Sequence, residues 1–334
     1  MADIVIARQQ LVDFYKQMVL LRMFDTKTCN LQKTGQIGTC STIAGHEAID
    51  VGAANALKST DIFVPYYRDQ GILLSRGLEL SDILAYWAGK ELANSKAPNT
   101  DLPNCVTIGP QYNIAAGVAS AVKYKKERNA VLVCGGDAST NTGSFSEALN
   151  VASLWQLPLV FLIKNNQWAI STPSSRGTAG DIHKRAHAYN MKGIRIDGTD
   201  VVEVYQACSE AFERARNNKG PTLIEAVTYR LRPHTTVDPD NLYRTNDEIQ
   251  QAWLQYDPVE KFKQYLQKNS GWSNAHDLEL QNVIKNEIDE QVSKYMTYPA
   301  ATIDEMFDHT YEDSSHLSTQ KHICEKYFSS TKEH

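Results

Sequence analysis

The sequence lacks the features that mark membrane proteins, secreted proteins and nucleic-acid binders. Its longest apolar run, Leu157 to Ile163, is interrupted by Pro158 and is far too short to cross a bilayer. The first residues, MADIVIARQQ, carry neither the basic start nor the long apolar stretch of a signal peptide. With 34 basic and 39 acidic residues, the net charge is −5, which argues against nucleic-acid binding. We therefore expect a cytoplasmic protein that binds neither membrane nor nucleic acid.

Paired cysteines and glycine-rich nucleotide motifs are also missing. The six cysteines are scattered and form no CxxC, which excludes a zinc ribbon and a thioredoxin-type pair. Neither GxxxxGK[ST] nor a GxGxxG after a strand occurs, so phosphate-loop ATPases and ordinary NAD-binding proteins are disfavoured. His183 and His187 share a helical spacing, but no third zinc ligand is evident. We expect reduced thiols, several of them in the core.

What the sequence does contain is an alternation of short apolar runs and amphipathic segments. At 334 residues, with 42% apolar and 22% charged residues, it can bury one large α/β core or two smaller ones. Continuous apolar runs suit strands that are buried on both faces of a parallel sheet. The rhythm predicts a doubly wound, mostly parallel sheet flanked by helices. The expected strands are Ala130–Cys134, Leu159–Ile163, Ile194–Ile196 and Thr222–Val227, and the expected helices are Tyr112–Lys125, Ser144–Leu154 and Val201–Asn217.

Helical patterns flank this central region. They predict helices at Arg8–Leu31 and Glu47–Leu57 before it, and at Glu248–Lys268 and Leu278–Tyr295 after it, with a polar, frayed end from Ser314. Residues 229–247 form a polar stretch with two prolines and no periodicity, and loops of that length are usually functional or mobile. We therefore divide the chain into an N-terminal helical extension (1–40), an α/β domain (41–245) with the mobile loop 229–247, and a C-terminal helical region and tail (246–334).

Two polar side chains follow the two strongest strands. Asp137 and Asn166 are 29 positions apart, which is the length of one strand–helix–strand unit. A right-handed crossover brings both strand ends to the same sheet edge, where open α/β sheets bind their ligands. Carboxylate and amide oxygens suit Mg²⁺, whose remaining positions water and phosphate can fill. The alternative is that both residues only cap turns, as Asp and Asn often do after strands.

Several spaced motifs then resemble one family. Gly136-Asp137 followed by Asn165-Asn166 resembles the signature of thiamine diphosphate enzymes. The blocks VPYYRDQG, NNQWAIS and YRLRPHTT resemble the alpha subunit of the decarboxylating component of 2-oxo acid dehydrogenase complexes, in order, over roughly residues 10 to 300. The likeness is strongest to bacterial pyruvate-type chains. The branched-chain type, which acts on 3-methyl-2-oxobutanoate, and the acetoin type remain alternatives.

The resemblance implies an activity and a set of site residues. The activity is the oxidative decarboxylation of a 2-oxo acid with thiamine diphosphate and Mg²⁺, followed by reductive acylation of a lipoyl group. Asp137 and Asn166 would bind Mg²⁺ through side-chain oxygens, and Trp168 through its carbonyl. His234 is the implied catalytic residue, in the loop 229–247, and it also belongs to the cofactor site. The other implied cofactor contacts are Tyr67, Arg68, Gly109, Gln111, Ala138, Ser139 and Lys164.

The resemblance also implies partners. A beta subunit would supply the glutamate that activates the cofactor's aminopyrimidine, because we find no second, pyrimidine-binding domain in the 334 residues. We therefore expect an α₂β₂ heterotetramer that meets the lipoyl domain of an acyltransferase component. Thr235 lies next to His234, near the position at which eukaryotic relatives are phosphorylated, but nothing in the sequence shows that a kinase acts on it.

Some residues depart from the family pattern or leave their role open. Ala138 replaces the third glycine of the signature, which is costly only if its φ is positive. This departure keeps a degenerate, non-catalytic homologue as an alternative. Gln111 stands where many relatives carry an apolar residue. His46 could cap a helix or border the substrate pocket. Arg232 and Arg244 either order the loop or remain solvated.

Overall fold

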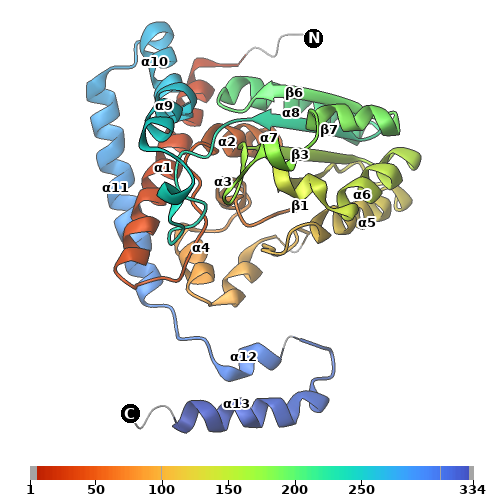
Figure 1. Ribbon diagram of the computed structural model, residues 1–334, viewed down its shortest axis with the longest axis vertical. Helices are drawn as coiled ribbons and strands as arrows, with labels where there is room; N and C mark the ends of the chain where they lie inside the picture. Colours follow the sequence, from red (N-terminus) through yellow and green to blue (C-terminus); the bar gives the residue numbers. More distant parts are fainter. Residues whose placement is uncertain (1–5, 99, 309, 331–334) are drawn as a thin grey trace.

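The computed structural model describes residues 6–98, 100–308 and 310–330. The outer ends of the expected extension and tail, residues 1–5 and 331–334, lie outside the described residues. A five-stranded parallel sheet forms the centre of the molecule (Figure 1). Its strands, in spatial order, are β1 (Ile62–Val64), β2 (Val131–Gly136), β3 (Leu159–Asn165), β7 (Thr222–Val227) and β6 (Lys192–Asp197), while β4 (Trp168–Ala169) and β5 (Thr172–Pro173) form a separate antiparallel pair.

The apolar strands are continuous because both faces of the sheet are covered. Along β3, Val160 and Leu162 join the core cluster that contains α1 (Arg8–Lys33), α2 (Glu47–Ala56) and α8 (Val201–Arg216). The alternate residues Phe161 and Ile163 join the opposite cluster, formed with α5 (Pro110–Tyr124) and α6 (Gly143–Leu154). This alternation follows from the two-residue period of a strand. The doubly wound α/β sheet predicted from the apolar runs is confirmed.

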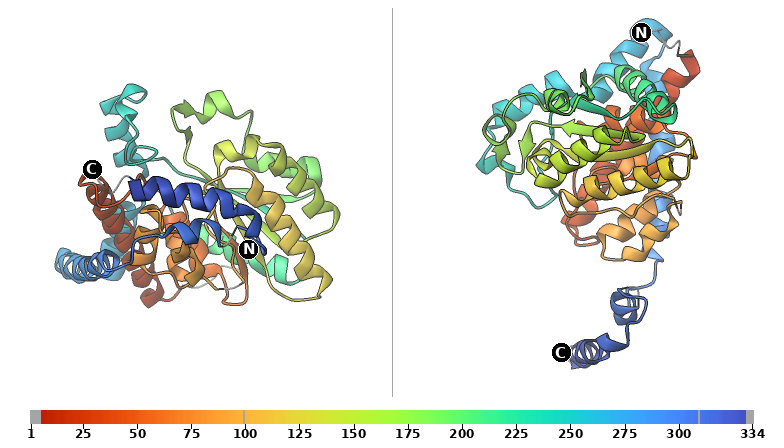
Figure 2. Two further views of the ribbon diagram at one scale, coloured as in Figure 1. Left: turned by 90° about the horizontal axis from the view of Figure 1, so that it is seen from below. Right: turned by 90° about the vertical axis from the view of Figure 1, so that its right-hand side faces the viewer.

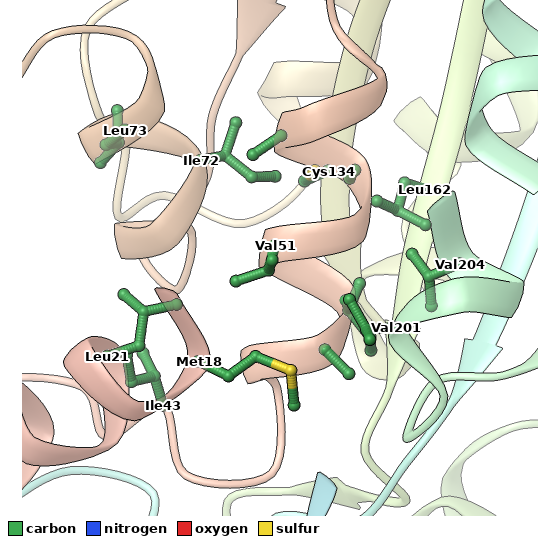
Figure 3. Packing of buried hydrophobic residues seen from close by; sticks show 14 of the residues in the cluster. Met18, Leu21, Ile43, Val51, Ile72, Leu73, Cys134, Leu162, Val201 and Val204 are labelled. Atoms are coloured by element: carbon green, nitrogen blue, oxygen red, sulfur yellow. The ribbon is translucent and has the colours of Figure 1, made fainter. Parts of the chain in front are cut away.

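The first of these two clusters ties the flanking helices to the sheet. Figure 3 shows Val51 on the side of α2 that faces Met18 and Leu21 of α1, while Val201 and Val204 of α8 and Leu162 of the sheet lie on the other side of α2. Helix α1 also packs against α10 (Pro258–Ser270) and α11 (Asn274–Met296), where the Tyr15 hydroxyl donates a 2.6 Å hydrogen bond to Asp277. The remaining helices of the body are α3 (Gln70–Ser75), α4 (Leu80–Trp87), α7 (Ser174–Gly177) and α9 (Asn246–Tyr256), with 3₁₀ turns η1 (Glu91–Lys96), η2 (Asp137–Asn141), η3 (Ile182–Tyr189) and η4 (Asp240–Leu242).

Two expectations for the C-terminal region are wrong. The single helix expected over 248–268 is two helices, α9 and α10, which meet at Asp257. The Asp257 carboxylate caps the new helix by accepting from the Val259 and Glu260 amides, and Pro258 takes the first helical position. The frayed end expected from Ser314 instead contains η5 (Ser315–Leu317) and α13 (Ser318–Ser330). Together with α12 (Ile303–Phe307), α13 extends away from the body of the molecule (Figures 1 and 2).

None of the described helices is long and apolar enough to cross a membrane. All six cysteines are free, and Cys40, Cys134 and Cys208 are buried.

The tip of β2 generates a stability prediction with a neighbouring control. A Cβ added at Gly135 would overlap the Tyr112 hydroxyl and lie 2.7 Å from the Ser139 Oγ, whereas a Cβ at Gly136 meets no described heavy atom within 4 Å. We expect Gly135→Ala to lower the free energy of unfolding by about 1–3 kcal/mol, as overpacking does. Gly136→Ala should change it by less than about 0.5 kcal/mol. Chemical unfolding without added ligand measures both, and equal stability of the two variants would contradict the packing argument.

Candidate active site

A cavity of about 440 Å³ opens at the carboxyl ends of β2 and β3. The two strands pair in parallel, with Gly136 beside Lys164, so the residues that follow them lie at one sheet edge as expected. Eight of the site residues implied by the resemblance line this cavity: Tyr67, Arg68, Asp137, Ala138, Ser139, Asn166, Trp168 and His234. The cavity therefore gathers side chains from segments that are far apart in the sequence.

The acidic part of the cavity is a buried carboxylate without a cation. Asp137 is 2% exposed, accepts a hydrogen bond from the Ser174 hydroxyl, and forms no ion pair within the described part of the chain. Burial raises the pKa of Asp137 above its ordinary value. The Asn166 Oδ1 accepts from the Trp168 amide at 3.1 Å. This oxygen-only set suits Mg²⁺. No group of three or more His, Cys, Asp or Glu residues that could hold a metal occurs among the described residues.

The basic part of the cavity is a buried guanidinium without an anion. Arg68 is 1% exposed and donates to the carbonyls of Thr42 and His234, the latter at 3.1 Å. It has no carboxylate partner among the described residues, although Arg–carboxylate pairing is the usual way to bury this charge. The guanidinium carbon lies 5.3 Å from the centre of the Tyr67 ring. One unpaired cation and one unpaired anion in the same cavity fit a metal–diphosphate group, whose charges complement both.

His234 lines the cavity in a defined tautomer. Its Nδ1 lies 3.3 Å from Arg68 Nη2, and a guanidinium can only donate, so Nδ1 accepts and the proton is on Nε2. Burial and the nearby Arg68 charge lower the pKa of His234 to about 3, which makes the ring neutral near pH 7. The His234 amide donates to Asp238 at 2.8 Å. His234 can therefore donate one hydrogen bond from Nε2.

The loop 229–247 is attached to the segment before α2. Thr235 forms a bridge with Ser41, and the Thr236 amide donates to the Cys40 carbonyl at 3.0 Å. The Thr42 hydroxyl donates to the Pro233 carbonyl at 2.5 Å. These contacts hold His234 at the cavity.

The loop arginines order the loop and do not line the cavity. Arg244 is 3% exposed and donates to the carbonyls of Arg230 and Arg232. The Arg232 Nε lies 3.3 Å from the Asp25 carboxylate of α1. Arg230 was missed by the sequence analysis: it is buried, it donates to the Ile170 carbonyl at 2.9 Å, and its Nη1 has no partner among the described residues. Arg230 could have been predicted to lie near the cavity, because it follows β7 directly and therefore lies at the same sheet edge.

Three implied contact residues lie outside the lining of the cavity. Lys164 is fully buried, and its ammonium pairs with Asp50 and, at 2.6 Å, with Asp69. This burial contradicts the expected direct phosphate contact of Lys164. Gly109, with φ of +109°, donates its amide to Gln111 Oε1 at 2.8 Å. The Gln111 Nε2 is a buried donor with no partner among the described residues, and the contact of Gly109 and Gln111 with a cofactor ring stays a prediction.

The alanine in the signature is compatible with the backbone. Ala138 is not among the residues with positive φ, and it lies in the 3₁₀ turn η2. Its methyl group therefore costs no left-handed strain, which was the one condition under which the replacement of glycine would be costly.

Comparisons with known proteins identify the family. The chain matches the dehydrogenase E1 component family over residues 15–304, and it belongs to that family. It is 38% identical over 330 residues to a pyruvate dehydrogenase E1 component subunit alpha from Acholeplasma laidlawii, covering 97% of this chain and 95% of that protein. It is also 38% identical over 301 residues to a 3-methyl-2-oxobutanoate dehydrogenase subunit alpha from Mycobacterium tuberculosis, covering 90% and 82%. The family resemblance inferred from the motifs is confirmed.

The buried Lys164 cluster generates a stability prediction. Lys164→Met leaves Asp50 and Asp69 buried without a cation, so we expect a loss of about 3–5 kcal/mol in the free energy of unfolding. Lys184→Met is the matched control, because Lys184 is 65% exposed and pairs with Asp181 on the surface. That change should cost no more than about 1 kcal/mol. Denaturant titration measures both, and a Lys164→Met protein as stable as the control would refute the cluster's role.

The lowered pKa of His234 predicts the direction of a pH effect. The folded-state pKa of about 3 lies below the ordinary value of 6.5, so the unfolded chain binds this proton more readily. The contribution of His234 to the free energy of unfolding is therefore fully present above pH 6.5, and it is lost as the pH drops toward 3. His234→Gln should reduce the slope of unfolding free energy against pH in this window, by up to one proton. His322→Gln is the control substitution, because the His322 side chain is 78% exposed. Identical slopes for all three proteins would disprove the burial of a neutral His234.

Proposed function

We propose that this chain is the alpha subunit of a pyruvate-type 2-oxo acid dehydrogenase component, which binds thiamine diphosphate and Mg²⁺ at the cavity beside β2 and β3. The observation that carries the proposal is that one cavity contains two buried side chains of opposite charge, Arg68 and Asp137, neither of which has an ion-pair partner among the described residues. Membership of the dehydrogenase E1 component family supports the reaction class. The alpha subunits of pyruvate dehydrogenase among the relatives support the substrate.

Different residues of the cavity would bind the metal ion and the diphosphate. Asp137 and Asn166 would bind Mg²⁺ through side-chain oxygens, and Trp168 through its carbonyl, while Arg68 would pair with the diphosphate. The amides of Ala138 and Ser139, at the start of η2, would approach the same phosphates. When bound, the cofactor supplies a carbon nucleophile for the 2-oxo carbon and an acceptor for the electron pair left by carbon dioxide. Exposed Val106, Ile108 and Ile170 give the mouth of the cavity an apolar lining.

His234 supplies a hydrogen-bond donor for this chemistry. Its Nε2–H can donate to the substrate carbonyl oxygen as negative charge develops there, or to a sulfur of the lipoyl group. Because Arg68 occupies Nδ1, the ring has only this one direction in which to donate. The same Arg68 thus serves the phosphate and the histidine.

The cavity also lacks one group that the reaction requires. Asp137 is the only carboxylate among the described residues that line it. The carboxylate that would activate the aminopyrimidine must then come from another chain, which supports an α₂β₂ assembly with a beta subunit and the apolar cavity mouth as part of their contact. We further propose that the assembled component passes its acyl group to the lipoyl domain of an acyltransferase. The scattered free cysteines favour a cytoplasmic location.

A branched-chain substrate is the second candidate, since the relative from Mycobacterium tuberculosis is as similar in identity as the relative from Acholeplasma laidlawii. The test is to purify the chain together with its beta subunit and to measure kcat/KM for pyruvate and for 3-methyl-2-oxobutanoate with a lipoyl acceptor. We expect pyruvate to be preferred by at least about tenfold, since a pocket built for a methyl group rejects added carbons at that level.

The controls separate the possible failures. The chain without its beta subunit, and the complex carrying Asp137→Asn, should be inactive. Preference for the branched acid would overturn the pyruvate assignment. Failure of the complex to bind thiamine diphosphate with Mg²⁺ would favour the degenerate homologue, whatever the substrate.

A further inference from the structure

A buried histidine outside the cavity touches one of the proposed metal ligands. His46 is 0% exposed and occupies the N-cap position of α2, but its side chain forms no capping hydrogen bond and does not line the cavity. His46 therefore fills neither of the two roles expected from the sequence, which were to cap the helix or to border the substrate pocket. Its Nε2 lies 3.0 Å from the Asn166 Nδ2, and its Nδ1 lies 3.2 Å from the Ile43 carbonyl oxygen.

Hydrogen-bond logic fixes the orientation of both side chains. The Trp168 amide can only donate, so the Asn166 atom 3.1 Å from it is the oxygen. The NH₂ group of Asn166 then faces His46, and since this group can only donate, the His46 Nε2 must be an unprotonated acceptor. The Ile43 carbonyl can only accept, so Nδ1 carries the proton. His46 is thus the neutral Nδ1–H tautomer. Hydrogen bonds connect Ile43, His46, Asn166 and Trp168 in series, and the donor in each bond is defined by the bond beside it.

We propose that His46 is a positioning residue that holds the Asn166 amide with its oxygen toward the metal site and its NH₂ away from it. This inference rests on the proposed function, in which Asn166 Oδ1 is a ligand of Mg²⁺. An amide can also sit the other way round, and it then presents to the cation an NH₂ group that cannot act as a ligand. His46 adds to the Trp168 amide in disfavouring that orientation, because its unprotonated Nε2 would then face the amide oxygen.

Substitutions at His46 test the role in the assembled complex. His46→Leu removes the acceptor, so we expect the concentration of Mg²⁺ needed for half-maximal binding of thiamine diphosphate to rise about 10- to 100-fold, as for other residues that orient metal ligands. His46→Gln can present an oxygen acceptor to Asn166 and should stay within about threefold of wild type. Binding is followed by the tryptophan fluorescence of the complex, since Trp168 lines the cavity, and by calorimetry. If His46→Leu fails to assemble, His46→Met, which also lacks an acceptor, takes its place.

A second background separates orientation from general packing. The carboxylate created by Asn166→Asp has two equivalent oxygens, so it has no amide orientation to lose. In that background, adding His46→Leu should weaken Mg²⁺ binding by less than about twofold. His183→Gln is the matched control, because His183 also bonds through Nδ1 to a mostly buried partner, Glu225, and lies outside the lining of the cavity.

Three outcomes would overturn the inference. They are an equal weakening by His46→Leu in the wild-type and Asn166→Asp backgrounds, a loss in His46→Gln as large as in His46→Leu, and normal Mg²⁺ binding by His46→Leu. Failure of the proposed function looks different, because the wild-type complex itself would then show no Mg²⁺-dependent binding of thiamine diphosphate.

Discussion

One buried ammonium group holds together the parts of the chain that build the cavity. Lys164, at the end of β3, pairs with Asp50 of α2 and with Asp69, and it donates to the Arg68 carbonyl at 2.9 Å. Asp50 in turn accepts from the Gly71 amide, and Asp69 from the Tyr66 amide. A buried lysine is tolerated only with such compensation. The sheet, α2 and the segment that carries Tyr67 and Arg68 are therefore coupled, and none of them can shift without uncovering a charge.

This compensation contrasts with the charges inside the cavity. The ammonium of Lys164 is matched within the chain, while the Arg68 guanidinium and the Asp137 carboxylate are not matched by any described residue. Isolated buried charges destabilise a folded protein, so a pair of them persists where another group completes it. Among the residues that line the cavity, the contrast distinguishes Arg68 and Asp137 as residues that suit a ligand, and it does so without reference to any relative. It also explains why Lys164, which the motif comparison assigned to the phosphates, serves the fold instead.

The sequence allowed the sheet to be predicted because the strands carry their own signal. Continuous apolar runs predicted β2 and β3, weaker runs predicted β6 and β7, and the 29-residue spacing predicted that Asp137 and Asn166 meet. The sheet face to which the Lys164 side chain points could also have been predicted. Strand alternation puts it on the same face as Leu162, toward α2, and not into the cavity. The ion-pair partners of Lys164 could not be predicted from the sequence, because Asp50 is 114 positions away and only the fold brings it close. The short elements β1, α3 and α4 carry too few residues for a period to be detected.

The replacement of a signature glycine by Ala138 shows why a motif has to be judged by its backbone. In η2, the hydroxyl of Ser139 donates to the Gly136 carbonyl at 2.5 Å, and that of Thr140 donates to the Asp137 carbonyl at 2.6 Å. Both bonds run back over three residues, which is the spacing of a tight helical turn. The turn is thus stabilised by side-chain hydroxyls in a conformation open to any residue, and it does not need the left-handed freedom that glycine provides. In the proposed function, the backbone amide of this residue approaches a phosphate, and an alanine supplies that amide as well as a glycine does.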